Sequence, residues 1–191
     1  PSLEHSLLIY DEIGKKEIAL IYDEYFGLQR NTQVPFIIFT PTWRANKERV
    51  ESLEIRRNVN GDAVTFMKEI KEKHACDSEK IVIGGLIGCK NDCYKPEEAL
   101  SIEESARFHQ WQIDKLIQGG VDFIFAASLP AVSEAEGIAQ IMSPLTIPYI
   151  LSFVIDRTGR LIDGTPLDEA FRTIDSSCAK PPDGFMINCS H

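Results

Sequence analysis

The sequence lacks a long apolar segment, an excess of positive charge and an even set of cysteines. No apolar run approaches the ~20 residues that a membrane-spanning helix needs. The net charge of −9 disfavours nucleic acid as a partner, because phosphate contacts require clustered Lys and Arg. The five cysteines are odd in number and irregularly spaced, which argues against a secreted disulfide framework. Since the first residues also lack the pattern of a signal peptide, we expect a cytoplasmic protein that binds neither nucleic acid nor membranes.

The chain also lacks the common phosphate-binding and zinc-finger motifs. Three glycines occur between residues 84 and 88, but they form neither a GxGxxG motif nor a P-loop, so phosphate binding is not indicated. Cys89 and Cys93 lie four positions apart, yet no second cysteine or histidine pair follows at zinc-finger spacing. We therefore regard these two cysteines as a weak signal for a metal site.

Short apolar segments alternate along the chain with segments of helical periodicity. Strands are predicted at residues 35–39, 81–85, 122–127, 147–154 and 185–187, and helices at 6–31, 58–74, 101–118, 133–141 and 165–176. We expect Gly14 to divide the first helix and Ser101 with Glu104 to form a capping box. We also expect Thr165 to be an N-cap, with Pro166 as the first helical residue.

Continuously apolar strands separated by helices are typical of a parallel sheet covered by helices. Right-handed crossovers leave two architectures, a (β/α)8 barrel or an open doubly wound sheet. A barrel needs eight strands and about 250 residues, whereas this chain stops directly after its fifth predicted strand. We therefore predict one α/β domain over residues 1–191, an incomplete (β/α)8 barrel of about five βα units.

Polar residues follow several of these strands, where barrels keep their active sites. Cys189 is a candidate nucleophile or metal ligand because a thiolate serves both roles; alternatively, it is a free cysteine that finishes a strand. The other candidates are expected to bind substrate and are Trp43, Arg44, Asn91, Asp92, Ser128 and Asn188.

Four stretches together resemble the homocysteine S-methyltransferase family: residues 41–46 (Pro-Thr-Trp-Arg-Ala-Asn), 85–94, 163–167 and 185–189 (Phe-Met-Ile-Asn-Cys). The first two resemble a bacterial branch of the family. The resemblance implies a (β/α)8 barrel in which three cysteines hold zinc, and zinc activates a thiol that accepts a methyl group. It makes Cys189 a catalytic residue and the first zinc ligand. It implies two small-molecule partners, a thiol acceptor such as homocysteine and a methyl donor.

The sequence departs from the family pattern in three places. The other two zinc ligands, which the family carries in a Gly-Gly-Cys-Cys turn, and the family's opening strand have no counterpart, so we expect a barrel truncated at both ends. Ala127 stands where many members carry a Glu that engages the homocysteine amino group, which favours a different thiol. An alternative is a barrel without catalytic activity that acts as a binding or assembly module, because open barrel edges invite self-association. A hydrolase using Cys189 and His191 is disfavoured, since no orienting carboxylate is identifiable.

Overall fold

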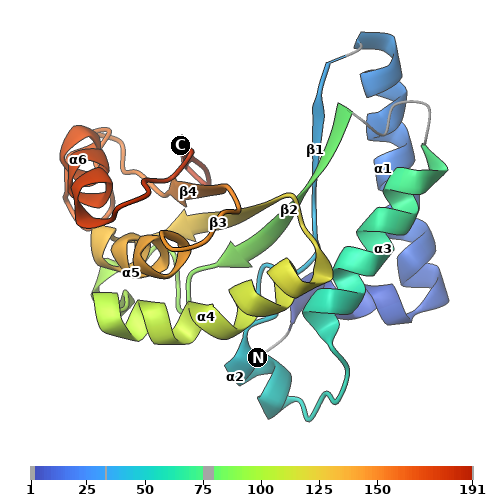
Figure 1. Ribbon diagram of the computed structural model, residues 1–191, viewed down its shortest axis with the longest axis horizontal. Helices are drawn as coiled ribbons and strands as arrows, with labels where there is room; N and C mark the ends of the chain where they lie inside the picture. The colour runs from blue at the N-terminus through green and yellow to red at the C-terminus, as the bar shows by residue number, and fades with distance from the viewer. Residues whose placement is uncertain (1–2, 33, 75–79, 191) are drawn as a thin grey trace.

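The computed structural model describes residues 3–32, 34–74 and 80–190. Cys76, one of the five cysteines, and His191 lie outside these residues. Along the chain the elements are η1 (Glu4–Tyr10), α1 (Glu12–Thr32), β1 (Phe36–Phe39), α2 (Lys47–Ser52), α3 (Val59–Lys73), β2 (Ile81–Gly88), η3 (Pro96–Glu98), α4 (Ile102–Gly119), β3 (Phe123–Leu129), α5 (Val132–Met142), β4 (Tyr149–Phe153), α6 (Leu167–Ser177) and β5 (Gly184–Ile187) (Figure 1).

The five strands form one parallel sheet in the order β1-β2-β3-β4-β5. Each strand therefore pairs with the next one along the chain, as predicted, and the order 3-2-1-4-5 of an open doubly wound sheet is excluded. The sheet curls from the steep β1 and β2 round to β3 and β4 (Figure 1). This curled half of a sheet is the incomplete (β/α)8 barrel that the sequence predicted.

The two faces of the sheet carry separate apolar clusters because successive side chains of a strand point to opposite faces. On the outer face, strand residues such as Ile83, Ile124 and Leu151 pack against α3, α4, α5 and α6 (Figure 1). On the inner face, Phe123 and Phe125 of β3 form a second cluster, which Phe39, Trp43, Ala127, Leu86 and Ile150 complete. The inner cluster packs the inner face of the sheet below the residues at the carboxyl ends of the strands.

The start of the chain differs from the predicted break at Gly14. Instead, η1 ends at Tyr10, and Asp11 separates it from α1. The Asp11 side chain accepts a hydrogen bond of 2.7 Å from the Gly14 backbone N–H, which caps α1. Gly14 lies inside α1, and a Cβ there would come within 2.6 Å of the Leu8 carbonyl oxygen. The glycine therefore allows η1 to pack closely on α1, and it does not end a helix.

Other helix boundaries are partly as predicted. Helix α4 begins with the predicted capping box, in which Ser101 and Glu104 bond reciprocally, and it ends at Gly120 with φ 85°. Helix α6 begins one residue later than predicted, because Pro166 is its N-cap and Thr165 does not cap it. The short helix α2, capped by the side chain of Asn46, was not predicted from the sequence. Among the residues described, no helix combines the length and the apolar character required to cross a membrane.

Candidate functional site

Cys189 lies at the carboxyl end of β5, next to the carboxyl end of β3. Its sulfur is 3.5 Å from the Ser128 hydroxyl oxygen and 3.3 Å from Nδ2 of Asn188. Asn188 Nδ2 also donates to the Ser128 hydroxyl over 2.7 Å. Its Oδ1 accepts from the Ser128 backbone N–H and from the hydroxyl of Ser152, which lies on β4. Residues from three neighbouring strands or strand ends therefore meet around one exposed thiol.

A β-bulge in β3 makes this meeting possible. The register runs from Ala126 opposite Leu151 to Leu129 opposite Phe153, so two β3 residues stand opposite a single β4 residue. Ser128, the second of those two, has a left-handed φ of 60°. This conformation directs its N–H to the Asn188 side chain. Bulges of this kind are frequent next to active sites, where they re-aim a side chain.

The loop that follows β2 reaches across to the same place. The Tyr94 hydroxyl donates to the Cys189 carbonyl oxygen over 3.2 Å. Burial raises the pKa of the Cys93 thiol, and the neighbouring Cys189 raises it further. Sequence reasoning missed both Cys93 and Tyr94 as neighbours of Cys189, although both belong to the stretch 85–94 that resembles the family.

Arg44 is almost fully buried and donates hydrogen bonds to the backbone of this loop. Its Nη1 donates to the backbone oxygens of Cys89, Lys90 and Asn91 over 2.8, 3.2 and 3.0 Å. The guanidinium also lies over the Trp43 ring, 4.4 Å from its centroid. These contacts engage Arg44 with the protein itself, so it shapes the loop beside Cys189.

The other two loop candidates bond within the loop. Asn91 Nδ2 donates to the Glu98 carbonyl oxygen over 2.7 Å, and Asp92 Oδ1 accepts from the Tyr94 N–H over 3.0 Å. The predicted site residues thus form two groups. Ser128, Asn188 and Cys189 contact one another directly, whereas Arg44, Asn91 and Asp92 bond to the loop. Trp43 packs in the inner cluster, and the Arg44 guanidinium lies over its ring.

A buried carboxylate that was not predicted from the sequence holds both ends of the loop. Glu134, in the first turn of α5, is 1% exposed. Its Oε1 accepts from the Lys90 N–H over 3.0 Å, and its Oε2 accepts from the Leu100 N–H over 3.4 Å. His109 Nε2 lies 3.1 Å from Oε1 and is itself fully buried. The charge of Glu134 also contributes, after burial, to raising the pKa of Cys89 to about 12, which makes that thiol unreactive.

Comparison with known proteins agrees with this geometry. The family model described as homocysteine S-methyltransferase matches residues 4–191, which is nearly the entire chain. The chain belongs to the homocysteine S-methyltransferase family. The Escherichia coli (strain K12) homocysteine S-methyltransferase is 24% identical over 118 residues, which cover 56% of this chain and 38% of that protein.

Solved structures of a homocysteine S-methyltransferase share the fold. The apo form of MmuM from Escherichia coli has a TM-score of 0.72 at 19% identity, covering 99% of this chain and 65% of the other. Its metallated form has a TM-score of 0.78 at 18% identity, covering 96% and 65%. The chain thus spans less than two thirds of the length of these relatives.

The described residues do not by themselves form a zinc site of the kind expected for this family. A catalytic zinc takes three protein ligands and one open position. Among residues 3–32, 34–74 and 80–190, no group of three His, Cys, Asp or Glu side chains is placed to hold a metal ion. Cys189 offers one thiol there, so the prediction that it is a zinc ligand stays a prediction.

Proposed function

We propose that this methyltransferase domain transfers a methyl group to the sulfur of a small thiol at the mouth of the half-barrel, beside Cys189. The observation that carries the proposal is the position of Cys189, the exposed thiol at the carboxyl end of β5 in the stretch that resembles the family motif. Barrel enzymes work at this end of their strands. Cys189 is also the proposed first ligand of a zinc ion, whose further ligands would lie outside the described residues.

The proposed reaction is a displacement at carbon. The acceptor thiol first loses its proton to solvent, and the resulting thiolate attacks the methyl carbon of the donor. A sulfur–carbon bond forms while the bond between the methyl group and the donor breaks, and the leaving group keeps the electron pair. The donor must therefore carry an activated methyl group. The protein contributes orientation, because Ser128 and Asn188 fix the position of Cys189.

The inner face gives a reason to propose an acceptor other than homocysteine. Ala127 stands where many family members place the carboxylate that engages an amino group, and it is buried within the apolar inner cluster. Its neighbour across the strand pair is Gly88, which likewise adds no charge. An ammonium group placed there would lose water without gaining a partner, which is costly. We therefore propose that a thiol without an amino group is the better acceptor.

The experiment compares acceptors on the 191-residue chain and on the same chain extended by the segment its relatives have. Methylation of homocysteine and of 3-mercaptopropionate is followed with a set of activated methyl donors, with Cys189→Ala as the matched control. We expect transfer in the extended chain, faster with 3-mercaptopropionate, and Ala127→Glu should reverse this preference. Transfer that is unchanged in Cys189→Ala, or absent with every thiol and donor, would overturn the proposal.

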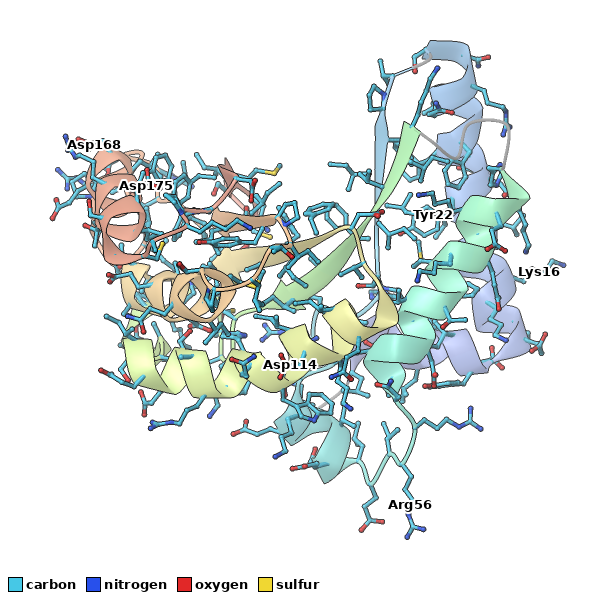
Figure 2. All side chains as sticks on the ribbon, viewed as in Figure 1. Lys16, Tyr22, Arg56, Asp114, Asp168 and Asp175 are labelled. Carbon is cyan, nitrogen blue, oxygen red and sulfur yellow. The ribbon has the colours of Figure 1, made fainter. Side chains whose placement is uncertain are left out.

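The open edges of the sheet favour a second candidate role, in self-association of the 191-residue chain. In the sheet described, β1 and β5 each pair on one side. Apolar side chains are exposed on both, including Ile37 at 44% and Met186 at 48%. On the β1 side, Tyr22 of α1 covers one backbone group, since its hydroxyl donates to the Phe39 carbonyl oxygen over 2.9 Å (Figure 2). Backbone groups and apolar surface of this kind invite another strand.

Light scattering at micromolar concentration tests this role. We expect a mass above that of one chain, and we expect Ile37→Lys to reduce it, because a charged residue on an edge strand opposes pairing. The control is Ile13→Lys on the exposed surface of α1, away from the strand edges. A compact monomer of the unmodified chain would exclude self-association and leave the proposed methyl transfer untouched.

A further inference from the structure

The side chain of Asn188 uses all of its hydrogen-bonding groups within the protein. Its Oδ1 accepts from the Ser128 N–H over 3.0 Å and from the Ser152 hydroxyl over 2.7 Å. Its Nδ2 donates to the Ser128 hydroxyl over 2.7 Å and to the Cys189 sulfur over 3.3 Å. A carboxamide has two acceptor positions on oxygen and two N–H donors. All four are engaged, so the side chain has no group left for a substrate.

The orientation of this amide follows from its partners. The Ser128 backbone N–H can only donate, so the atom that faces it must be the amide oxygen. The nitrogen then faces the Ser128 hydroxyl and the Cys189 sulfur. The Ser128 hydroxyl also lies 3.5 Å from the Cys189 sulfur, and either of these two groups can be the donor. The sulfur therefore has one fixed donor, Asn188 Nδ2, and a second hydrogen-bond partner in the Ser128 hydroxyl.

We propose that Asn188 is a positioning residue that fixes the Cys189 sulfur at the mouth of the half-barrel, and that it does not bind substrate. Its side chain joins Ser152 of β4, Ser128 in the bulge of β3 and Cys189, the second residue after β5. Ser128 and Cys189 both adopt a left-handed backbone conformation, with φ of 60° and 52°, which residues other than glycine rarely adopt. The bulge turns the Ser128 N–H away from β4. Asn188 Oδ1 accepts a hydrogen bond from this N–H and so helps to stabilise the left-handed conformation of Ser128.

This role deepens the proposed methyl transfer and rests on it only for what Cys189 does. A thiol that contacts substrate or metal must be held in one place, because small displacements of a reacting group greatly reduce rate. Side chains that hydrogen-bond to a metal ligand and orient it also contribute to metal affinity and activity. The conformation of Cys189 can be measured without any transfer reaction, so failure of one proposal is distinguishable from failure of the other.

Asn188→Asp separates the two halves of the side chain. The carboxylate keeps both acceptor bonds, to the Ser128 N–H and the Ser152 hydroxyl, but it cannot donate to the sulfur. Three-bond NMR couplings of labelled cysteine report whether Cys189 occupies one side-chain rotamer. We expect one rotamer in the unmodified chain and in Ser152→Ala, and averaging over several rotamers in Asn188→Asp. The Ser128 amide should stay protected from hydrogen exchange in Asn188→Asp, which would show that the side chain of residue 188 still accepts the Ser128 N–H.

A measurement on the unmodified chain keeps the proposal testable if Asn188→Asp does not fold. The side-chain amide protons of Asn188 should exchange with solvent at least about tenfold more slowly than those of Asn31, which is exposed at the end of α1. Equal exchange of the two side chains would overturn the proposal. So would a folded Asn188→Asp variant in which Cys189 keeps its single rotamer, or rotamer averaging at Cys189 in the unmodified chain.

Discussion

Replacing the buried carboxylate of Glu134 by an amide should destabilise the protein and loosen the loop between residues 89 and 100. Glu134 accepts hydrogen bonds from the Lys90 N–H and the Leu100 N–H, and its Oε1 lies 3.1 Å from His109 Nε2. Glutamine has nearly the same shape, but one of its two terminal atoms is a donor. Whichever way the amide turns, that donor faces at least one N–H group of the loop. Glu134→Gln therefore leaves a buried backbone N–H without an acceptor.

The magnitude follows from the number of bonds affected. An unsatisfied buried donor costs about 1–3 kcal/mol, and the remaining bonds to a neutral oxygen are weaker than those to a carboxylate. Because the amide keeps some of the bonds of Glu134, we expect a loss of about 1–3 kcal/mol in the free energy of unfolding.

Urea denaturation measures this loss, and amide hydrogen exchange reports on the loop. The matched control is Glu136→Gln, two residues further along α5 and only partly buried. Burial raises the pKa of Glu136, so its charge opposes folding above that pKa, and its replacement should change stability by less than about 0.5 kcal/mol. If the two variants unfold at the same urea concentration and exchange alike between residues 90 and 100, Glu134 does not hold the loop.

Three further predictions test the inner face, a helix cap and the metal. Gly88→Ala should cost about 1–3 kcal/mol and alter tryptophan fluorescence, because its Cβ would lie 2.2 Å from Trp43 Nε1; Gly184→Ala, with nothing within 4 Å, should match the unmodified chain. Hydrogen bonds with the capping serine, Ser101, lower the pKa of Glu104 from 4.5. The ionised Glu104 therefore stabilises the protein above pH 4.5, and this contribution is lost as pH falls through the lowered pKa. A difference in stability between the unmodified chain and Glu104→Gln that persists in stronger acid would contradict this prediction. The 191-residue chain should hold little zinc after dialysis, and extension by the family's Cys-Cys segment should create tight binding that Cys189→Ala removes. Stoichiometric zinc in the 191-residue chain, or unchanged affinity in extended Cys189→Ala, would refute that prediction.

The fold could be predicted because its signals are local and repeated. Each strand is a continuous apolar run, and each connecting helix shows its own periodicity, so alternation alone indicates a parallel sheet. The helix boundaries that were predicted wrongly depend on contacts between elements. Gly14 suggests a break when read alone, but it contacts Leu8 of η1 and needs Asp11 as a cap. Helix α2 is only six residues long, too short for its periodicity to be recognised.

The candidate site could be predicted in position but less well in role. Parallel strands place their carboxyl ends together, and this principle predicted that Trp43, Arg44, Asn91, Asp92, Ser128 and Cys189 gather at one end of the sheet. In the structure Ser128 and Cys189 contact each other and Asn188. It does not reveal what a polar side chain bonds to. Arg44 reads as a free cation in the sequence, yet it donates to three loop oxygens. Glu134 follows β3 by five residues on a helix and gives no local sign of its contacts with the loop.

The physical reason for this difference is that the site is built from backbone groups that secondary structure leaves unpaired. A buried N–H or C=O must find a partner, so a loop after a strand recruits side chains from distant elements. Arg44 supplies donors to the carbonyls of the loop, Glu134 supplies acceptors to its amides, and Asn188 serves the N–H that the bulge exposes. Some polar residues at the strand ends therefore support the structure, and others are free to react. The hydrogen bonds that each side chain makes within the protein distinguish the two kinds. By this criterion Cys189, which is exposed, is the group that we propose for the chemistry.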